Sequence, residues 1–360
     1  MIKVYEPDLT GNESKYLQEC ISSTWISSRG AYIDKFEKDF TNFTGTTSTT
    51  VSSGTTALHL ALWALGITVG DEVLVPTLTY VASANAISFV GAKPIFVDSN
   101  EKTWQIEVNS LAEKLTPKTK AVIVVHLYGH ACDLSAISSF CKNNNLLLIE
   151  DCAEALGTTY GANHVGQFCD ASTYSFFGNK TITTGEGGMV CSNKGGVIEL
   201  AKKLKNQGVS KTEEYWHDIQ GHNFRMTNVQ AAIGCAQIER IDNILKKKRG
   251  MYKTYKEELS GLPVIFQNEY TESESSCWMT SILTETGEYR DQLRRYLAEK
   301  NIETRPLFKP LHTLPFFYDE KNNLPVATDL SARGINLPSG TVNSERNLEI
   351  VIAAIKSFYQ

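Results

Sequence analysis

One segment of the sequence places a lysine where it could act as a nucleophile. Ser175–Thr181 surrounds Lys180 with aromatic, hydroxyl and glycine residues, and Thr183–Gly188 adds further hydroxyls and glycines. A lysine that is partly removed from water loses its proton more easily and can form a Schiff base. The segment is not a P-loop, because Asn179 stands where that motif requires glycine. Taken alone, a lysine is more often a solvated surface charge.

A second segment, Ser52–Ala57, could hold a phosphate group. Its small and hydroxyl residues fall at an expected strand-to-helix turn. Backbone N–H groups at the start of a helix are free to bind an anion. The alternative is ordinary helix capping by Ser53 or Thr55, which is the more frequent use of such residues. The sequence leaves both interpretations open.

A third segment, Leu146–Glu154, ends an apolar run with three carboxylates, Glu150, Asp151 and Glu154. Carboxylates at the end of a buried strand are unfavourable unless a positive group meets them. Asp151 could therefore pair with a cationic atom of a cofactor. A capping or salt-bridged aspartate is the alternative.

Other site types lack their signatures. His126 and His130 are four residues apart but bracket Tyr128-Gly129 at a strand end, so a structural role is favoured and no metal site is expected. No Gly-x-Gly-x-x-Gly motif follows an expected strand, which argues against a dinucleotide enzyme. No Gly-x-Ser-x-Gly elbow of hydrolases is present.

The elements that must position these segments are strands alternating with helices. From about residue 48 the apolar runs are continuous, as in strands covered on both faces. Repeated β-α-β units predict a mostly parallel sheet flanked by helices, with ligands at the carboxyl ends of its strands. The expected strands are Ser48–Ser53, Glu72–Val75, Lys93–Asp98, Ala121–Tyr128 and Leu146–Asp151, and the expected helices are Thr55–Leu65, Val81–Val90, Asn109–Leu115 and Leu134–Asn143.

The pattern changes after Lys194, which predicts a second, smaller unit. We expect a large domain over residues 1–235 and a small α+β domain over residues 236–360. The later elements are expected to be helices at Val197–Asn206, Tyr289–Lys300 and Asn343–Phe358, strands at Trp278–Thr284 and Ile302–Thr304, and an amphipathic stretch from Thr227 to about Leu259.

Composition narrows the class of protein further. The 360 residues are 42% hydrophobic and carry a net charge of −5, so neither nucleic acid nor an anionic membrane is an expected partner. No signal peptide and no membrane-length apolar run is evident. The eight cysteines form no Cys-x-x-Cys pair, which favours reduced and mostly buried thiols in a cytoplasmic protein.

The order of phosphate turn, carboxylate and lysine matches the needs of pyridoxal 5′-phosphate (PLP), namely a phosphate site, a partner for the ring nitrogen and an amine for the aldehyde. The sequence resembles the DegT/DnrJ/EryC1/StrS family of PLP-dependent sugar-nucleotide aminotransferases, and within it the perosamine-forming members. The resemblance covers nearly the whole chain and is carried by Ser23–Ser28, Pro76–Tyr80, His126–His130, Ser175–Met189, Asn223–Asn228, Thr304–Pro306 and Ile335–Ser339.

The resemblance implies the aspartate-aminotransferase fold, α/β with a mostly parallel central sheet and a smaller C-terminal α+β domain, and a homodimer with shared active sites. It also implies roles for single residues. Lys180 matches the lysine that bonds to the cofactor and later moves a proton, and Asp151 the carboxylate that keeps the ring nitrogen protonated. The other cofactor-binding positions are Gly54, Thr55 and Ser175 for the phosphate, Asn223 from the partner subunit, Tyr80 stacked on the ring, and Glu154 near the ring hydroxyl.

The implied reaction moves the amino group of L-glutamate to a nucleotide-linked 4-keto-6-deoxyhexose, releasing 2-oxoglutarate. GDP-4-keto-6-deoxymannose is the favoured acceptor, giving GDP-perosamine, and a UDP- or dTDP-linked 4-keto-6-deoxyglucose is the alternative. A related sugar dehydratase carries histidine in place of the lysine, so Lys180 favours amination over dehydration or a non-catalytic role. The residues considered for the sugar-nucleotide pocket, each with a structural role as the alternative, are Trp25, Arg29, Arg305, Lys309 and His312.

Overall fold

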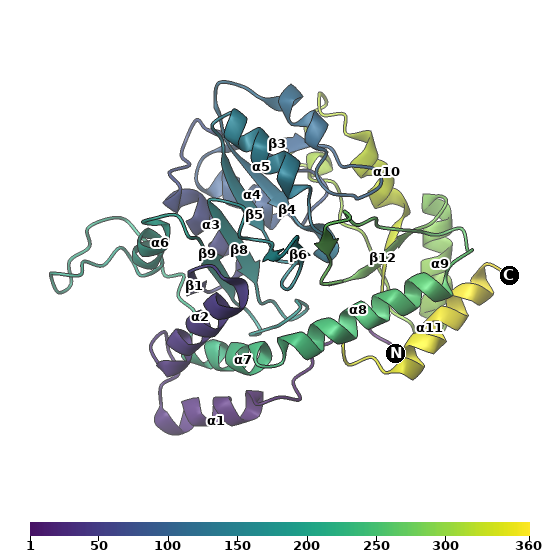
Figure 1. The fold of residues 1–360 in the computed structure, drawn as a ribbon, viewed down its shortest axis with the longest axis horizontal. Helices are drawn as coiled ribbons and strands as arrows, with labels where there is room; N and C mark the ends of the chain where they lie inside the picture. The colour runs from purple at the N-terminus through teal and green to yellow at the C-terminus, as the bar shows by residue number, and fades with distance from the viewer.

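The computed structural model describes residues 1–360 and contains one large sheet, one smaller sheet and one short three-stranded sheet (Figure 1). The large sheet has seven strands in the order β1-β9-β8-β5-β4-β2-β3. Strands β2, β3, β4, β5 and β8 pair in parallel, whereas β9 pairs antiparallel with both β8 and β1. The bounds are β1 Ser48–Val51, β2 Glu72–Pro76, β3 Lys93–Val97, β4 Thr119–Val125, β5 Leu147–Asp151, β8 Ala171–Ser175 and β9 Gly188–Cys191.

Helices cover both faces of this sheet, which is why its strands are apolar throughout. Neighbouring residues of β2 point to opposite faces: Val73 and Val75 pack with α3 and α4, whereas Leu74 packs with α2 and α5. The helices are α1 Glu13–Ser23, α2 Ala31–Thr44, α3 Gly54–Ala64, α4 Ala82–Phe89, α5 Leu134–Asn143, α6 Val197–Lys205 and α7 Asn228–Ile238.

The register of the sheet brings the segments Ser52–Ala57, Leu146–Glu154 and Ser175–Thr181 to the same end of the strands. Asp151, at the end of β5, is level with Val125 on β4 and Thr173 on β8. Val51 and Ser175 both pair with Gly188 on β9, so the turn after β1 lies next to the end of β8. The carboxyl ends of non-consecutive strands therefore form one continuous rim, as expected for an open α/β sheet.

The smaller sheet is antiparallel, with the order β10-β12-β14-β13. Its core also contains residues of α9 and α11. The bounds are β10 Ile265–Phe266, β12 Thr280–Leu283, β13 Arg305–Pro306, β14 Gly334–Leu337, α9 Gly287–Glu299, α10 Pro325–Arg333 and α11 Glu345–Phe358. The three-stranded sheet joins β6 Thr159–Tyr160 and β7 Asn163–His164 to β11 Ser273–Glu274.

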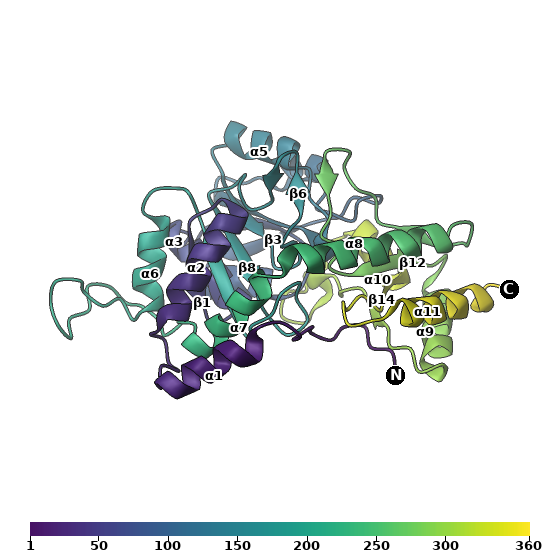
Figure 2. The same ribbon diagram turned by 60° about the horizontal axis from the view of Figure 1, so that its bottom comes forward.

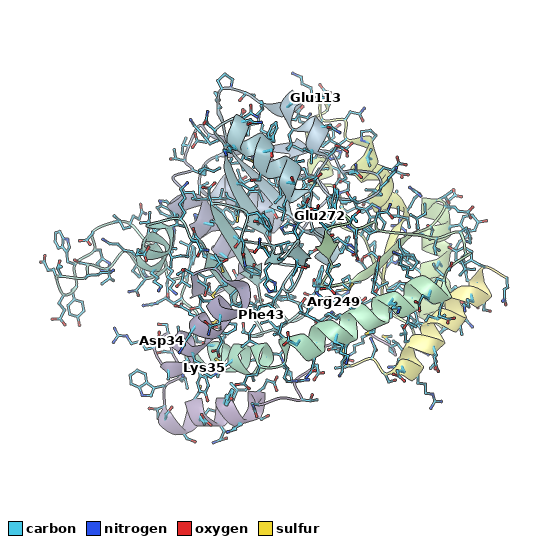
Figure 3. The ribbon with its side chains drawn as sticks, in the orientation of Figure 1. Asp34, Lys35, Phe43, Glu113, Arg249 and Glu272 are labelled. Atoms are coloured by element: carbon cyan, nitrogen blue, oxygen red, sulfur yellow. The ribbon has the colours of Figure 1, made fainter.

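Helix α8, Ile241–Glu258, connects the two larger sheets and spans from one to the other (Figures 1 and 2). Its first turns, including Leu245, pack in the core of the large sheet, and Tyr255 near its end packs in the core of the smaller sheet. Arg249, labelled in Figure 3, binds the carbonyls of Gly157 and Ser275, each at 2.9 Å. One helix therefore holds segments from both halves of the chain together.

Both chain termini lie beside the smaller sheet (Figure 1). Ile2 forms a parallel bridge with Ile302, and the backbone N–H of Ser339 donates to the carbonyl of Val4 at 2.8 Å. The first residues of the chain therefore pack with elements formed by its last sixty or so residues.

Two sequence expectations about secondary structure are wrong. Asn109–Leu115 is not an α-helix but two short 3₁₀ turns, Val108–Ser110 and Ala112–Lys114, because Pro117 restricts the chain soon after them. Ile302–Thr304 is not a strand of the smaller sheet. Ile302 bridges Ile2, and the strand begins at Arg305, because the partner of this segment comes from the other end of the chain.

No helix combines the length and the apolar character that crossing a membrane requires. All eight cysteines are free thiols, and seven of them are buried.

Candidate active site

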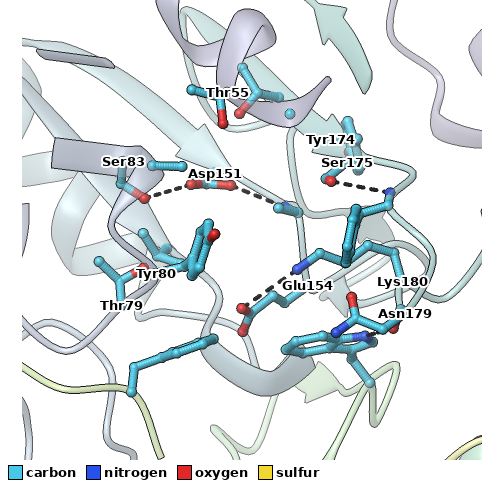
Figure 4. Close-up of a pocket in the computed structure, with 18 of the residues that line it drawn as sticks. Thr55, Thr79, Tyr80, Ser83, Asp151, Glu154, Tyr174, Ser175, Asn179 and Lys180 are labelled. Atoms are coloured by element: carbon cyan, nitrogen blue, oxygen red, sulfur yellow. Dashed lines mark hydrogen bonds and ion pairs between the residues drawn. The ribbon is translucent and has the colours of Figure 1, made fainter. Parts of the chain in front are cut away.

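A cavity of about 370 Å³ opens at the rim of the large sheet, between this sheet and the smaller one (Figure 4). Tyr80 and Phe177 are its exposed aromatic residues, 58% and 48% exposed. Eight of the residues expected at the site from the sequence line it: Gly54, Thr55, Tyr80, Asp151, Glu154, Ser175, Lys180 and Arg305.

Asp151 is buried at the end of β5, where backbone and hydroxyl groups fix its carboxylate. Ser83 Oγ donates to Oδ2 at 2.8 Å, and the backbone N–H of Ala153 donates to Oδ1 at 3.1 Å (Figure 4). Burial raises the pKa of Asp151, while these two hydrogen bonds and the charge of Lys180 lower it. No cation lies within ion-pair distance of Asp151, so a positive group in the cavity would find an oriented carboxylate.

Lys180 lies in the loop between β8 and β9, and its ammonium faces Glu154 (Figure 4). Its Nζ is 3.7 Å from Glu154 Oε1 and 4.1 Å from the centre of the Trp278 ring. The second oxygen of Glu154 accepts the N–H of Tyr128 at 2.8 Å. Burial lowers the pKa of Lys180, although the carboxylates of Glu154 and Asp151 oppose this. The solvated-surface interpretation is therefore wrong, since only 13% of the lysine side chain is exposed.

The turn after β1 caps a helix and also lines the cavity. Ser53 Oγ accepts the N–H of Thr56 at 3.2 Å, and Thr56 Oγ1 accepts the N–H of Ser53 at 3.0 Å, which completes a capping box. A Cβ on Gly54 would lie 2.7 Å from the Cβ of Ser175, so only glycine allows this approach. Capping and cavity lining therefore coexist, because Gly54 and Thr55 begin α3 at the cavity wall.

Five sequence-predicted residues lie outside this cavity. His312 is buried and its Nδ1 hydrogen-bonds Thr77 Oγ1 at 2.8 Å. Trp25 and Lys309 are exposed, as is Asn223, whose Oδ1 accepts from Arg225 Nε at 3.0 Å.

The fifth, Arg29, lines a separate cavity of about 220 Å³. Its cationic wall also includes Lys202, Lys205 and Arg225. The structure of a single chain therefore leaves two guanidinium groups, from Arg29 and Arg225, outside the cavity that contains Lys180.

Other wall residues were not predicted from the sequence. Ser83 lies one helical turn beyond Tyr80, a spacing that could have revealed it. Trp278, Phe308 and Asn336 come from the far end of the chain, where no local pattern marks them. Their place in the wall depends on how the smaller sheet packs against the large one.

His126, Glu150 and Cys152 have ligand atoms close enough to share a metal ion. Their polar atoms are already used, however. His126 Nε2 lies 2.9 Å from Glu150 Oε2, and its Nδ1 accepts the N–H of Cys132 at 3.1 Å. Glu150 also accepts the N–H groups of Gly166 and Phe168. This hydrogen-bond network holds the loop after β7 against β5.

The cavity fits PLP on observations of its own. Gly54 and Thr55 offer the free N–H groups of a helix start beside Ser175. The buried carboxylate of Asp151 has no cationic partner, and two buried polar atoms of the wall, Thr173 Oγ1 and Asn179 Oδ1, have no hydrogen-bond partner. A largely buried lysine, a carboxylate without a cationic partner and an anion-binding helix start together define the site of a PLP-dependent enzyme.

Comparison with known proteins agrees with this class. Residues 7–356 match the model of the DegT/DnrJ/EryC1/StrS aminotransferase family. Two relatives are named GDP-perosamine synthase: one from Escherichia coli O157:H7 is 51% identical over 99% of this chain and 98% of its own, and one from Vibrio cholerae is 50% identical over 100% and 99%. Among solved structures, the sugar aminotransferase Spr1654 from Streptococcus pneumoniae in its pyridoxamine 5′-phosphate (PMP) form superposes with a TM-score of 0.93. It is 27% identical, and the match covers 99% of this chain and 98% of that one.

The chain belongs to the DegT/DnrJ/EryC1/StrS aminotransferase family. It is a PLP-dependent aminotransferase with the α/β fold of that class, as the sequence predicted.

Glu154 provides a test of the electrostatics around Lys180. Burial raises the pKa of Glu154 to about 7, and the Glu154 carboxylate in turn raises the pKa of Lys180. In Glu154→Gln the carboxylate is lost, so the pKa of Lys180 falls and more of its reactive amine form is present. We expect the apoenzyme variant to capture added PLP several-fold faster than wild type above pH 7, where Glu154 is ionised.

The measurement is the rate at which added PLP becomes bonded to Lys180, which we call PLP capture. The bond is trapped with borohydride, and the rate is determined as a function of pH. Below about pH 7 the capture rates of wild type and Glu154→Gln should become equal, because wild-type Glu154 is then protonated. Glu113→Gln, which removes an exposed carboxylate far from the cavity, is the control. A shift of the profile to higher pH in Glu154→Gln would contradict this account.

Proposed function

We propose that this aminotransferase transfers the amino group of L-glutamate to C-4 of GDP-4-keto-6-deoxy-D-mannose, giving GDP-perosamine and 2-oxoglutarate. The observation that carries the proposal is the identity of about half of all residues, over essentially the full chain, with two proteins named GDP-perosamine synthase. The presence of Lys180 and Asp151 in one cavity supports catalysis rather than binding alone.

PLP, when bound, supplies an aldehyde for amine exchange and a ring that withdraws electrons from the reacting carbon. Asp151 would hold a proton at the ring nitrogen, because its carboxylate is buried, is oriented by Ser83 and the N–H of Ala153, and has no cationic partner. Gly54, Thr55 and Ser175 would hold the phosphate at the start of α3. Tyr80, an exposed aromatic residue of the cavity wall, would offer its ring to the cofactor.

Lys180 would hold the cofactor through its Nζ amine, and the same amine would accept and return the proton at the substrate carbon. Burial lowers the pKa of Lys180 from the usual value of lysine, which makes its reactive amine form more accessible. Glu154 supplies the opposing charge and accepts a proton more readily than an exposed glutamate does. The wall residues from the last part of the chain, including Trp278, limit the access of water.

The test is a comparison of acceptor sugars. Purified holoenzyme is incubated with glutamate and with GDP-, UDP- or dTDP-linked 4-keto-6-deoxyhexoses, and the amino sugar is measured by mass spectrometry. We expect kcat/KM for the GDP-linked acceptor to exceed the others by at least about tenfold, since polar contacts to a base discriminate strongly. A preference for the UDP- or dTDP-linked 4-keto-6-deoxyglucose would instead assign a viosamine-forming activity.

We further propose that the enzyme is a homodimer in which Asn223 binds the cofactor phosphate of the partner subunit. In support, Asn223 is exposed and lies outside the cavity of its own chain. The preceding segment, residues 207–222, extends away from the rest of the chain (Figures 1 and 2) and exposes Tyr215 and Trp216. Exposed aromatic side chains on such an extension are typical of a contact with another protein.

Mixing two inactive variants tests this arrangement. Lys180→Ala and Asn223→Ala are each expected to be impaired, and dissociating and reassociating them together should restore activity. A mixed dimer would contain one site with both residues intact only if Asn223 acts across the interface. Sedimentation should give twice the chain mass of 40.0 kDa. Mixing without any gain would show that Asn223 acts within its own chain or not at all.

A further inference from the structure

Lys248 is a buried lysine without a carboxylate partner. It lies on α8, and only 1% of the residue is exposed. Its Nζ donates to the carbonyls of Trp278 at 3.1 Å and Ser339 at 3.2 Å, and lies 4.6 Å from the centre of the Tyr5 ring. Burying an ammonium group costs several kcal/mol unless polar partners compensate it. Two carbonyls and one aromatic face are the compensation found here.

Burial lowers the pKa of Lys248 to about 7. Both protonation states can keep the observed contacts, because a neutral amine still has two N–H donors for two carbonyls. The contacts of Lys248 therefore do not depend on its charge. Lys248 does not line the cavity, so a direct role in the reaction is excluded by its position.

Two residues that contact Lys248 also contact the backbone at Lys180. The hydroxyl of Tyr5 donates to the carbonyl of Lys180 at 2.5 Å. Trp278 Nε1 donates to the carbonyl of Asn179 at 2.6 Å, and the same indole ring faces the Lys180 ammonium. The two carbonyls that flank the α-carbon of Lys180 are thus held by side chains of residues that meet at Lys248.

This support comes from outside the loop that carries Lys180. Between β8 and β9 the chain has no regular secondary structure, and the N–H of Lys180 makes only a local turn to Phe177 O at 2.9 Å. Tyr5 is 175 residues away in the sequence and Trp278 is 99 residues from Asn179. The position of the Lys180 backbone therefore depends on how these distant segments are themselves held in place.

We propose that Lys248 is a positioning residue for Lys180, acting through Tyr5 and Trp278. It fixes the N-terminal segment and Trp278, two residues before β12, against each other, so that the Tyr5 hydroxyl and the Trp278 indole N–H meet the carbonyls of Lys180 and Asn179. This inference rests on the proposed role of Lys180 as the residue that bonds to the cofactor.

The first experiment removes the donors of Lys248 while keeping an unbranched side chain that is only one atom shorter. In Lys248→Met the apoenzyme is expected to capture PLP at Lys180 about tenfold more slowly, because a small displacement of a nucleophile costs much of its rate. Capture is measured without glutamate or sugar, by borohydride trapping and by peptide mass spectrometry that locates the modified lysine. Circular dichroism and thermal unfolding confirm that the variant is folded.

Tyr255→Phe is the matched control. Tyr255 lies on the same helix, is fully buried, and its hydroxyl donates to the carbonyl of Pro338 at 3.0 Å, next to Ser339. The variant therefore loses a buried hydrogen bond between α8 and the same segment, without touching Tyr5 or Trp278. It is expected to lose stability but to keep the wild-type capture rate. Equal slowing in Tyr255→Phe and Lys248→Met would overturn the proposal, because it would reflect general loosening.

A mutant cycle tests the route through the two aromatic residues. Tyr5→Phe and Trp278→Phe each remove one donor and leave an aromatic side chain, and each should slow capture several-fold. In the variant carrying both changes, adding Lys248→Met should slow capture by less than about twofold, because the coupling has already been lost. If all effects multiply independently, or if Tyr5→Phe and Trp278→Phe leave the rate unchanged, the proposal fails. Absence of capture in wild type would instead contradict the proposed role of Lys180.

Discussion

Lys180→Ala is expected to lower turnover by at least about 10⁴-fold while the protein still binds PLP without a covalent bond. Alanine removes the amine that we propose bonds to the cofactor and moves the proton, and no other lysine lines the cavity. The contacts assigned to the phosphate and the ring nitrogen, from Gly54, Ser175 and Asp151, remain. Turnover is measured as amino-sugar formation, and cofactor binding by equilibrium dialysis.

Lys194→Ala is the control for loss of a lysine charge. Lys194 is 48% exposed, pairs with Asp170 at 2.7 Å and lies outside the cavity. It is expected to act as wild type in both assays. Steady turnover by Lys180→Ala would remove the basis of the assignment, and loss of all PLP binding would show that the covalent bond, rather than the surrounding cavity, provides the affinity.

Asp151→Asn is expected to lower kcat by about 10²–10³-fold with little change in KM for the sugar. The amide keeps the size of the side chain and can still accept from Ser83, but it no longer stabilises a positive charge on the ring nitrogen. Stabilisation of the electron-rich reacting state is lost, whereas sugar binding is not. The measurement is steady-state kinetics with PLP at saturation.

Ser83→Ala separates the effect of the orientation of the Asp151 carboxylate from the effect of its charge. It removes only the hydroxyl that orients Asp151 Oδ2 and leaves the carboxylate charge, so a loss of at most about tenfold is expected. The loss of kcat should be smaller in Ser83→Ala than in Asp151→Asn, because the charge of the carboxylate contributes more than its orientation. Equal losses in the two variants would indicate that the carboxylate acts mainly by its position.

The sequence predicted the parts of the site that are local to one strand end. Asp151 ends a continuous apolar run, and Gly54 and Thr55 follow another, so their place at the rim of a parallel sheet could be derived from pattern alone. The expected helix over Leu134–Asn143 has the same bounds as α5. Most other elements of the large sheet differ by a few residues at their ends.

The parts that sequence reasoning missed depend on packing between distant segments. Trp278 lies in the cavity wall and stacks with Tyr128, which follows β4. Tyr5 reaches the Lys180 carbonyl because the first residues of the chain pair near residue 302. No local sequence pattern predicts the position of Trp278 or of Tyr5. Ile302 likewise pairs with a residue at the opposite end of the chain instead of continuing a strand.

The division of the chain at residues 235 and 236 stays a prediction. The apolar core of the large sheet continues through Ile238 to Leu245, beyond that point, and the core of the smaller sheet begins to include the same helix at Tyr255. The boundary drawn from composition falls within α7, shortly before α8, which belongs to both cores.

The most direct test of the central claim follows the bound cofactor through both halves of one cycle. Holoenzyme is first mixed with glutamate and then, after the donor is removed, with GDP-4-keto-6-deoxymannose, while the absorption band of lysine-bound PLP is recorded. The account predicts that glutamate removes the band and releases 2-oxoglutarate, and that the keto sugar restores the band as GDP-perosamine forms. A band that glutamate leaves unchanged, or that the keto sugar fails to restore, would contradict it.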